Sequence, residues 1–369
     1  MSSVIISDRD NVTLIPGLDL DYDVERYSKE TIGGPREAKI NVSGNDRDLW
    51  RLINRVRCPV TIYSDKGDAA WWGFVSDIDA VVLYPNNSER GRVRVGVSIK
   101  DVFNDLAVAY AAVDPTDNSR TRETTNYFQD ALSIDGYGSK QLLWSPGAAT
   151  EAHAEAAGTA KLYQSRYPEP IIRPAENETE SGAILTCRGW WDTLEWQYYQ
   201  NTGTALVDSA IQAGTIISTE GQFFKKLYRD IDSGLTLRET RDGDNTALYY
   251  VMQMLETGTT NYRRMLANID QYRNVRIYEE PARPLYPYRL LADGSFENPF
   301  GEPIRNELCP VGFWARRVDV ITTSIDAHLL TDPSWVFVEG MEYIVKEDRL
   351  IHRARGDLDP WEFPIINYG

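Results

Sequence analysis

One hairpin constrains the fold of this chain more than any other segment. The sequence CPVTIYSDKGDAAWWGFVSDID, residues 58–79, has strand-like residues on both sides of a polar turn at 64–68, which predicts two antiparallel strands. Trp71 and Trp72 are neighbours in the second strand, and neighbouring side chains of a strand point to opposite faces. If one indole fills a core, the other must face a second layer, a partner chain or a ligand.

Short strands and polar turns fill most of the first hundred residues. A helix interrupts them near residue 50, where Leu49 and Ile53 recur at helical spacing behind Asp46, a residue type that favours the N-cap. Another alternating strand, 93–99, follows the hairpin. Residues 1–105 are therefore predicted to form a β-barrel domain with one helix against it.

The rest of the chain divides into three further regions. Residues 106–183 are rich in turns and contain an Ala-rich helix near 149–166 with Thr150 as its N-cap, which predicts an α+β insertion. Residues 184–280 join an aromatic strand segment to helical patterns, which predicts a helical α+β domain. Residues 281–369 return to hairpins after three prolines and predict a second β-barrel domain. The expected fold class is mainly β, with two related antiparallel β-barrel domains and inserted α+β domains.

The charge balance limits the possible partners. The chain has 39 Lys and Arg against 55 Asp and Glu, a formal net charge of −16 at pH 7. Tight wrapping of DNA and adhesion to an anionic membrane both need a basic surface, so neither is expected. No apolar run reaches the roughly 18 to 20 residues of a membrane-spanning helix, and the N-terminal residues do not resemble a signal peptide. We therefore expect synthesis and folding in the cytosol, without stable membrane anchoring.

Residues that usually carry chemistry are few and scattered. Cys58, Cys187 and Cys309 lie far apart and form no CxxC pair, which favours buried thiols over a disulfide or a zinc site. The three histidines are isolated from one another. No nucleophile elbow, phosphate-binding loop or dinucleotide fingerprint occurs. The sequence therefore predicts a protein that is not an enzyme, with no catalytic, cofactor-binding or metal-binding residues.

The segment DLDYDVERYSKE, residues 19–30, has the acidic spacing of a calcium-binding loop. Asp19, Asp21 and Asp23 occupy the first three acidic positions of an EF-hand loop, and a glutamate stands at the twelfth. The sixth position, where the sharp turn requires glycine, holds a valine. A solvated acidic strand edge, which discourages pairing with other chains, is the preferred interpretation.

Aromatic side chains exceed what one small barrel needs. Tryptophan and tyrosine are enriched at protein interfaces, although most of these side chains are expected to be core. By strand alternation, Trp72 and Phe74 share the face opposite to Trp71. We expect that face to pack on Trp50 and Ile53 of the helix. The candidate packing or interface residues are Trp50, Trp71, Trp72, Phe74, Trp190, Trp191 and Trp196.

Three segments resemble the tail hub proteins of tailed bacteriophages. The longest, GGPREAKINVSGNDRDLWRLINRVRCPVTIYSDKGDAAWWGFVSDID at 33–79, is similar to the N-terminal barrel of that family in its Gly-Gly-Pro start, its short helix and its Trp-Trp-Gly-Phe-Val hairpin. The segments ILTCRGWWDTLEWQYY (184–199) and ETGTTNYRRMLANIDQYRNVRIYEEP (256–281) are also similar to that family. The resemblance extends over most of the chain and includes no catalytic signature.

This resemblance implies a structural protein of the virion tail tip. Such hubs are similar in fold to the baseplate hub of contractile phages and to the base of type VI secretion spikes. They carry two related β-barrels per chain and assemble as trimers, so that six barrels form a pseudo-hexameric ring continuing the tail tube. The implied partners are other copies of the chain, a distal tail protein, a tail-tip spike or fibre protein, the tape-measure protein, and double-stranded DNA in transit without specific binding. An acidic lumen would repel phosphate and let the genome slide during ejection.

Two alternatives stay open at this level. The first is a hexameric distal tail or adhesion-ring protein, which would build a ring with one barrel per chain. The second is a tail-associated hydrolase that cuts cell-wall polymers. Such an activity often follows the hub fold as a C-terminal extension, and the last predicted hairpin ends close to Gly369, so no extension is expected here.

Overall fold

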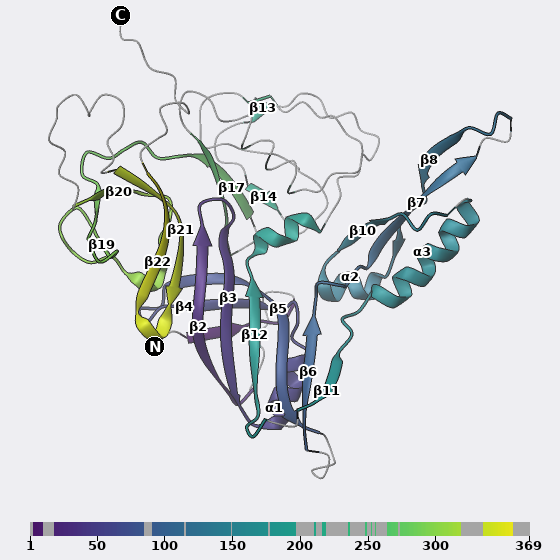
Figure 1. Ribbon diagram of the computed structural model, residues 1–369, viewed down its shortest axis with the longest axis horizontal. Coiled ribbons are helices and arrows are strands. Elements are labelled where there is room, and N and C mark those ends of the chain that lie inside the picture. The colour runs from purple at the N-terminus through teal and green to yellow at the C-terminus, as the bar shows by residue number, and fades with distance from the viewer. Residues whose placement is uncertain are drawn as a thin grey trace, which may run out of the picture.

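A computed structural model of the chain consists mainly of strands, with short helices between them (Figure 1), and confirms the predicted mainly β class. The structure describes residues 3–9, 18–84, 91–113, 116–148, 150–175, 178–196, 210–211, 216–218, 235–236, 248, 252, 255, 264–271, 274–318 and 335–356. Most of the helical α+β unit predicted within 184–280 lies outside these residues.

A sheet of 13 strands forms the body of the molecule. Its strands are β1 (Ser3–Ile6), β2 (Leu20–Glu30), β3 (Gly34–Gly44), β4 (Pro59–Tyr63), β5 (Ala69–Leu83), β6 (Arg92–Ser98), β11 (Ile171–Pro174), β12 (Gly182–Arg188), β18 (Tyr288–Leu290), β19 (Phe296–Glu297), β20 (Trp314–Arg317), β21 (Trp335–Ile344) and β22 (Arg349–Gly356). The strand order is β1-β4-β5-β12-β3-β2-β21-β20-β18-β19, with β6 also on β5, β11 on β6 and β22 on β21.

The predicted hairpin forms as β4 and β5. Ile62 lies opposite Trp71 in the antiparallel ladder, and an irregularity follows, so that Tyr63 lies opposite Ala69. Because β5 is 15 residues long, it pairs with β4 near its start and with β6 near its end, while β12 runs along its other side. The strand β5 therefore has three neighbouring strands, and it carries several of the aromatic side chains considered below.

Both ends of the chain contribute to this one sheet. The strand β12 lies between β3 and β5, so residues 182–188 belong to the N-terminal sheet. The C-terminal strand β21 pairs antiparallel with β2, with Arg26 opposite Ile344. The strand β1 approaches β2 without a ladder between them, and no sheet among the described residues is closed. Two closed barrels are therefore not confirmed, and the coarser mainly β description holds.

The helix α1 (Asp46–Ile53) covers one end of the sheet's core with buried Leu49. Its N-cap is Asn45, whose side-chain oxygen accepts a hydrogen bond from the Asp48 amide at 2.9 Å. The prediction of Asp46 at this position is wrong by one residue, because the Asp46 carboxylate accepts a hydrogen bond from the Leu83 amide at 2.8 Å instead.

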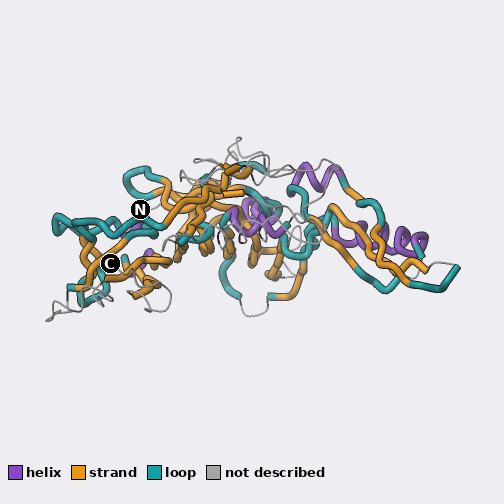
Figure 2. Tube along the Cα trace, turned by 90° about the horizontal axis from the view of Figure 1, so that it is seen from above, coloured by secondary structure: helices purple, strands orange, loops and turns teal. Residues whose placement is uncertain are grey.

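A smaller unit projects from the body at the right of Figure 1 and also in the view from above in Figure 2. Its elements are β7 (Asp105–Val113), β8 (Arg120–Thr124), β9 (Phe128–Gln129), α2 (Ala131–Tyr137), β10 (Gln141–Trp144) and α3 (Glu151–Ser165). As predicted, α3 begins after Thr150, whose hydroxyl accepts a hydrogen bond from the His153 amide. A Cβ atom at Gly158 would lie 2.6 Å from the Phe128 ring, so glycine lets α3 pack closely on the sheet. This unit begins at Asp105, one residue before the range predicted as the α+β insertion, and ends within that range.

The described strands of the third region form two small sheets. Their strands are β13 (Ala210–Ile211) with β15 (Leu235–Thr236), and β14 (Ile216–Ser218) with β17 (Asn274–Glu279) and β16 (Met265–Ile269). The strand β16 abuts the main sheet, where the Gly33 amide donates a hydrogen bond to the Ala267 carbonyl at 2.9 Å. Three short 3₁₀ turns complete the described elements: η2 (Trp190–Glu195), η3 (Asn306–Leu308) and η5 (Val345–Glu347).

Candidate functional site

Trp71 is a core residue. Its side chain is fully buried, on the same face of β5 as Gly73, as alternation predicts. A Cβ atom at Gly73 would lie 2.6 Å from the Trp71 ring and 2.1 Å from the Arg188 carbonyl oxygen of β12. Glycine is therefore required next to the two tryptophans because the indole and the neighbouring strand occupy the space of a side chain.

Trp72 connects the main sheet to β16. Its indole Nε1 donates a hydrogen bond to the carbonyl oxygen of Ile269 at 3.0 Å. The Lys29 ammonium lies 5.1 Å from the ring centroid, within the range of a cation–π interaction. The side chain is half-buried, so the second tryptophan of the pair faces a second layer of this chain.

Trp50 lies at the other end of β5. Its indole Nε1 donates a hydrogen bond to the Leu83 carbonyl at 2.9 Å. Phe74 instead contacts Trp190, at 5.1 Å between ring centroids, and Trp196, at 5.4 Å. Nine residues of strand separate Phe74 from Leu83, which corresponds to about 30 Å at roughly 3.3 Å per residue. The expected packing of Trp50 on the face of Trp72 and Phe74 is therefore wrong, because Trp50 meets the opposite end of the strand.

The side chain of Arg57 lies among three of the candidate aromatic rings. Its guanidinium carbon is 5.0 Å from the centroid of Phe74, 4.5 Å from Trp190 and 5.0 Å from Trp196. Its Nε donates a hydrogen bond to the Tyr137 carbonyl of α2 at 3.0 Å. The residue is buried and its backbone has a φ of 72°, a conformation that costs a non-glycine residue about 1 kcal/mol or more.

Lys140 is a second buried cation beside the first. Its ammonium lies 5.3 Å from the Trp196 ring and 4.9 Å from the Phe103 ring. It donates hydrogen bonds to the carbonyl oxygens of Ile99, at 2.9 Å, and of Lys100. Burial lowers the pKa of the Lys140 ammonium to about 8. We call Arg57, Phe74, Lys140, Trp190 and Trp196 the aromatic joint, because its members come from the main sheet, from η2 and from the projecting unit.

Trp191 packs beside the joint where two of the hub-like segments meet. A Cβ atom at Gly33 would lie 3.0 Å from the Trp191 ring, and one at Gly189 would lie 1.7 Å from the Pro35 carbonyl oxygen. The Gly189 amide donates a hydrogen bond to the Arg36 carbonyl at 2.6 Å. The Gly-Gly-Pro turn and the Gly-Trp-Trp turn are therefore in direct backbone contact, although they are distant in the sequence.

The joint is built to hold two units together. Its aromatic rings surround two cations that water would otherwise solvate. Its hydrogen bonds to carbonyl groups join Arg57 to α2 and join Lys140 of the projecting unit to Ile99, which follows β6 of the main sheet. Sequence reasoning found Phe74, Trp190 and Trp196 from their aromatic content but missed both cations. No local pattern marks Arg57, and its partners become visible only once β5 and η2 are adjacent.

Metal-binding groups and reactive thiols are the features of interest among the described residues. No group of three or more His, Cys, Asp or Glu side chains within them could hold a metal ion. Cys58, Cys187 and Cys309 are buried and unpaired, as predicted, and burial raises the pKa of each thiol. No helix in the described ranges is long and apolar enough to cross a membrane.

The acidic segment is part of β2. Asp21 and Asp23 are exposed, and the carboxylate of Asp23 pairs with the Lys346 ammonium at 3.2 Å. From Arg26 to Glu30 the strand is paired on both sides, by β3 and by β21, so the interpretation of this segment as a sheet edge is wrong for that half. Residues 20–30 form an extended strand, whereas a calcium-binding loop would need a sharp turn at this place.

Comparisons with protein-family models, with curated proteins and with solved structures find no match to this chain.

Proposed function

We propose that this chain is a structural protein of a phage tail tip, the hub that forms a ring continuing the tail tube. In this role it assembles as a trimer with pseudo-sixfold symmetry and carries a spike or fibre protein on one side and a distal tail protein on the other. The tape-measure protein and double-stranded DNA pass through its centre. No catalytic step is part of the proposal.

One observation carries the proposal: strands from both ends of the chain pair within one sheet. The ladder of β2 with β21 fixes the N-terminal and C-terminal strand regions relative to each other, with Lys29 opposite Met341. A ring that imitates sixfold symmetry with three chains needs two β units per chain at a fixed angle. A continuous ladder supplies that rigidity more directly than a flexible linker would.

The hub-like segments support the proposal in a second way. The segment 33–79 folds into a strand, a short helix and a hairpin in the order that the resemblance implies. The turns at 33–35 and 189–191 meet, and Trp72 donates a hydrogen bond to the Ile269 carbonyl, so the segment 33–79 contacts each of the other two hub-like segments. Segments that resemble one family and that also pack together favour a shared architecture over a chance likeness.

Averaged images and native mass of the purified protein, alone and with its tail partners, test the proposal. We expect a threefold ring with six β units around an axis, and charged side chains near that axis that are mostly Asp and Glu. A strict sixfold ring with one β unit per chain would favour the distal tail or adhesion-ring alternative. Degradation of cell-wall polymers by the pure protein would favour the hydrolase. A lumen dominated by Lys and Arg would contradict DNA sliding.

A further inference from the structure

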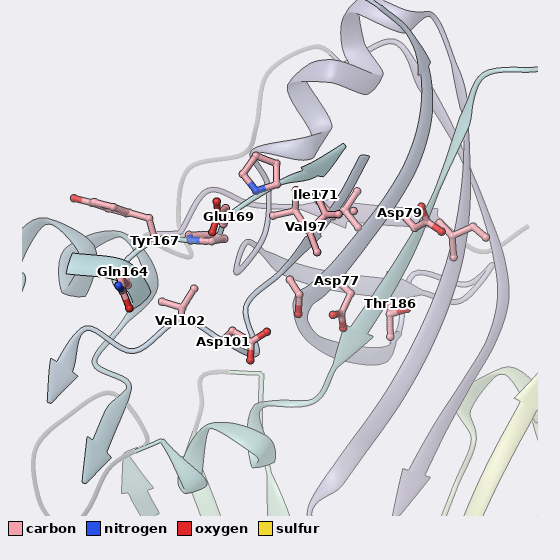
Figure 3. A pocket seen from close by; sticks show the side chains of 16 residues that line it. Asp77, Asp79, Val97, Asp101, Val102, Gln164, Tyr167, Glu169, Ile171 and Thr186 are labelled. Carbon is pink, nitrogen blue, oxygen red and sulfur yellow. The ribbon is translucent and has the colours of Figure 1, made fainter. Parts of the chain in front are cut away.

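A groove lies between the main sheet and the chain that leaves α3 (Figure 3). Its volume is about 710 Å³, which is within the range of pockets that hold ligands or side chains of a partner. Its apolar lining includes Val97, Val102, Ile171 and Ile184, and the last two side chains are 57% and 38% exposed. An occupant of this groove would therefore bury apolar surface of its own.

The charged residues that line the groove are all acidic. They are Asp77, Asp79, Asp101 and Glu169, and no Lys, Arg or His is among the lining residues. Two of them have a basic neighbour on the exposed sheet surface, Lys100 and Arg94, each at 3.6 Å. Exposed ion pairs at this distance contribute little, about 0 to 1 kcal/mol. The groove therefore favours an occupant that is apolar and positively charged.

The neighbouring sheet edge does not invite an added strand. In the ladder of β11 with β6, the Ala175 amide donates to the Arg92 carbonyl, so residues 171 and 173 also turn their amides toward β6. The outward positions are then 170, 172 and 174. Pro170 and Pro174 have no amide hydrogen to offer, which blocks main-chain pairing at this edge. A partner must therefore bind through side chains in the groove.

A segment with the complementary chemistry lies elsewhere in the same chain. The sequence PARPLYPYRL, residues 281–290, contains two arginines and no acidic residue. Leu285 and Tyr286 are 85% and 73% exposed. The segment is anchored at both ends: the Trp314 indole donates to the Pro281 carbonyl at 2.8 Å, and β18 holds the other end in the sheet.

Three prolines stiffen the segment between these anchors. Proline fixes its own φ and restricts the residue before it, so an exposed chain with a proline at every third position loses little entropy on binding. Side chains of Leu and Tyr held on such a segment can enter a pocket without much reordering. Leu285 and Tyr286 are neighbours and together expose apolar surface that a partner could cover.

We propose that residues 281–290 of one copy bind the acidic groove of a second copy. Leu285 and Tyr286 enter the groove against Ile171 and Ile184. Arg289 exchanges its exposed ion pair with Glu297, at 2.9 Å, for a carboxylate of the groove. This contact deepens the proposed function, because it rests on the ring and names the surfaces that would join its subunits.

The positions of the two surfaces suit a ring. The segment enters β18, on the side of the body where β19 lies at the left of Figure 1, whereas the groove lies by β6 and β11 toward the right. Two different surfaces on opposite sides of one chain make a head-to-tail contact, which closes into a ring when its rotation permits. A twofold dimer would instead need one surface that binds itself.

Cysteine cross-linking tests this contact in the full-length protein. The variants are Leu285→Cys and Ile171→Cys, both at exposed positions, and the native thiols are buried and do not compete. Under mild oxidation, a chain with both substitutions should give cross-linked dimers and trimers. A mixture of the two single variants should give dimers only, because each chain then has one reactive end. Val113→Cys, at an exposed position of β7, replaces Leu285→Cys in the matched control.

Charge provides an independent arm of the test. Glu169→Lys in the groove should lower the rate of the Leu285–Ile171 cross-link about tenfold at low salt, and 1 M salt should remove that difference. Cross-linking no faster than the Val113 control, at any protein concentration, overturns the proposal. This includes the case in which the groove binds only a basic segment of another protein.

The two proposals fail in different ways. A threefold ring in averaged images without the Leu285–Ile171 cross-link would leave the hub standing and remove this contact. Cross-links that build open chains, with no closed ring, would keep the contact and contradict the hub.

Discussion

Replacing Arg57 with methionine tests whether the aromatic joint fixes the projecting unit on the main sheet. Methionine keeps an apolar stem and removes the guanidinium, so at least two kinds of interaction are lost. The hydrogen bond from a charged donor to the Tyr137 carbonyl contributes about 1.5–3 kcal/mol. The contact of a desolvated cation with three aromatic rings contributes about 2 kcal/mol. Because the variant no longer bears the cost of burying a charge, we expect a net loss of about 2–3 kcal/mol.

Hydrogen exchange at the joint measures this loss directly. The Lys140 amide donates to the Asn104 side-chain oxygen at 2.8 Å, and the Asn104 amide donates to the Lys140 carbonyl at 3.1 Å. Both amides exchange only when this part of the structure opens. In Arg57→Met their exchange should be roughly 30- to 150-fold faster, which is the factor that corresponds to about 2–3 kcal/mol.

A matched substitution controls for the loss of an arginine. Arg94 has a half-exposed side chain that pairs with Asp79 and Glu178. Because exposed pairs contribute at most about 1 kcal/mol, Arg94→Met should change exchange at the joint less than fivefold. If Arg57→Met folds and its joint amides exchange within threefold of the wild type, the rings and the carbonyl do not hold the unit, and the reasoning is refuted.

Three further predictions concern stability and solubility. Gly73→Ala should lower the free energy of unfolding in urea by about 1–3 kcal/mol because its Cβ would lie 2.1 Å from a carbonyl oxygen of β12. Gly96→Ala, whose Cβ would lie in open space, should not lower it. Equal urea midpoints for the two variants would contradict the close contact. Burial lowers the pKa of Lys140 to about 8 from 10.5, so between these values the unfolded chain holds a proton that the folded chain has released. The free energy of unfolding therefore rises with pH in that window. Between pH 8 and 10, urea titrations should show the wild type becoming more stable relative to Lys140→Met. A difference between the two proteins that does not change with pH would argue against the pKa shift. Replacing Pro170 and Pro174 with threonine should increase light scattering at high concentration because it adds outward amides to the β11 edge, and unchanged scattering would show that the prolines do not protect it.

Elements whose signals are local could be predicted from the sequence. The β4–β5 hairpin depends on a short turn and on alternation, and both act between residues close in the chain. The helix α3 begins where Thr150 can accept the His153 amide, again a local interaction. The cap of α1 was misplaced because Asn45 and Asp46 are both capping residues. The choice between them depends on the Leu83 amide, which is nearly 40 residues away.

Long-range pairing is what the sequence could not supply. A glycine such as Gly340 indicates a turn by itself, yet β21 continues through it with a shift of register, because β2 and β22 pair on its two sides. The insertion of β12 between β3 and β5 follows from the same kind of pairing and has no local signal. For this reason several strands could be predicted from the sequence, whereas their pairing within one sheet could not, and the two related β-barrel domains stay unconfirmed.

The two adjacent tryptophans show how this limit affects the search for function. Alternation correctly required that one indole leave the core face, and Trp72 does so. Its partner is the Ile269 carbonyl of the same chain, so the Trp72 indole is satisfied without a second protein. The rings of Trp190 and Trp196 similarly contact the Arg57 guanidinium of the same chain. Residues that already have partners inside the chain are poor candidates for an interface. The side chains that remain exposed are a better guide, and Leu285 of the 281–290 segment and Ile171 of the acidic groove, which we propose to meet between copies, are two of them.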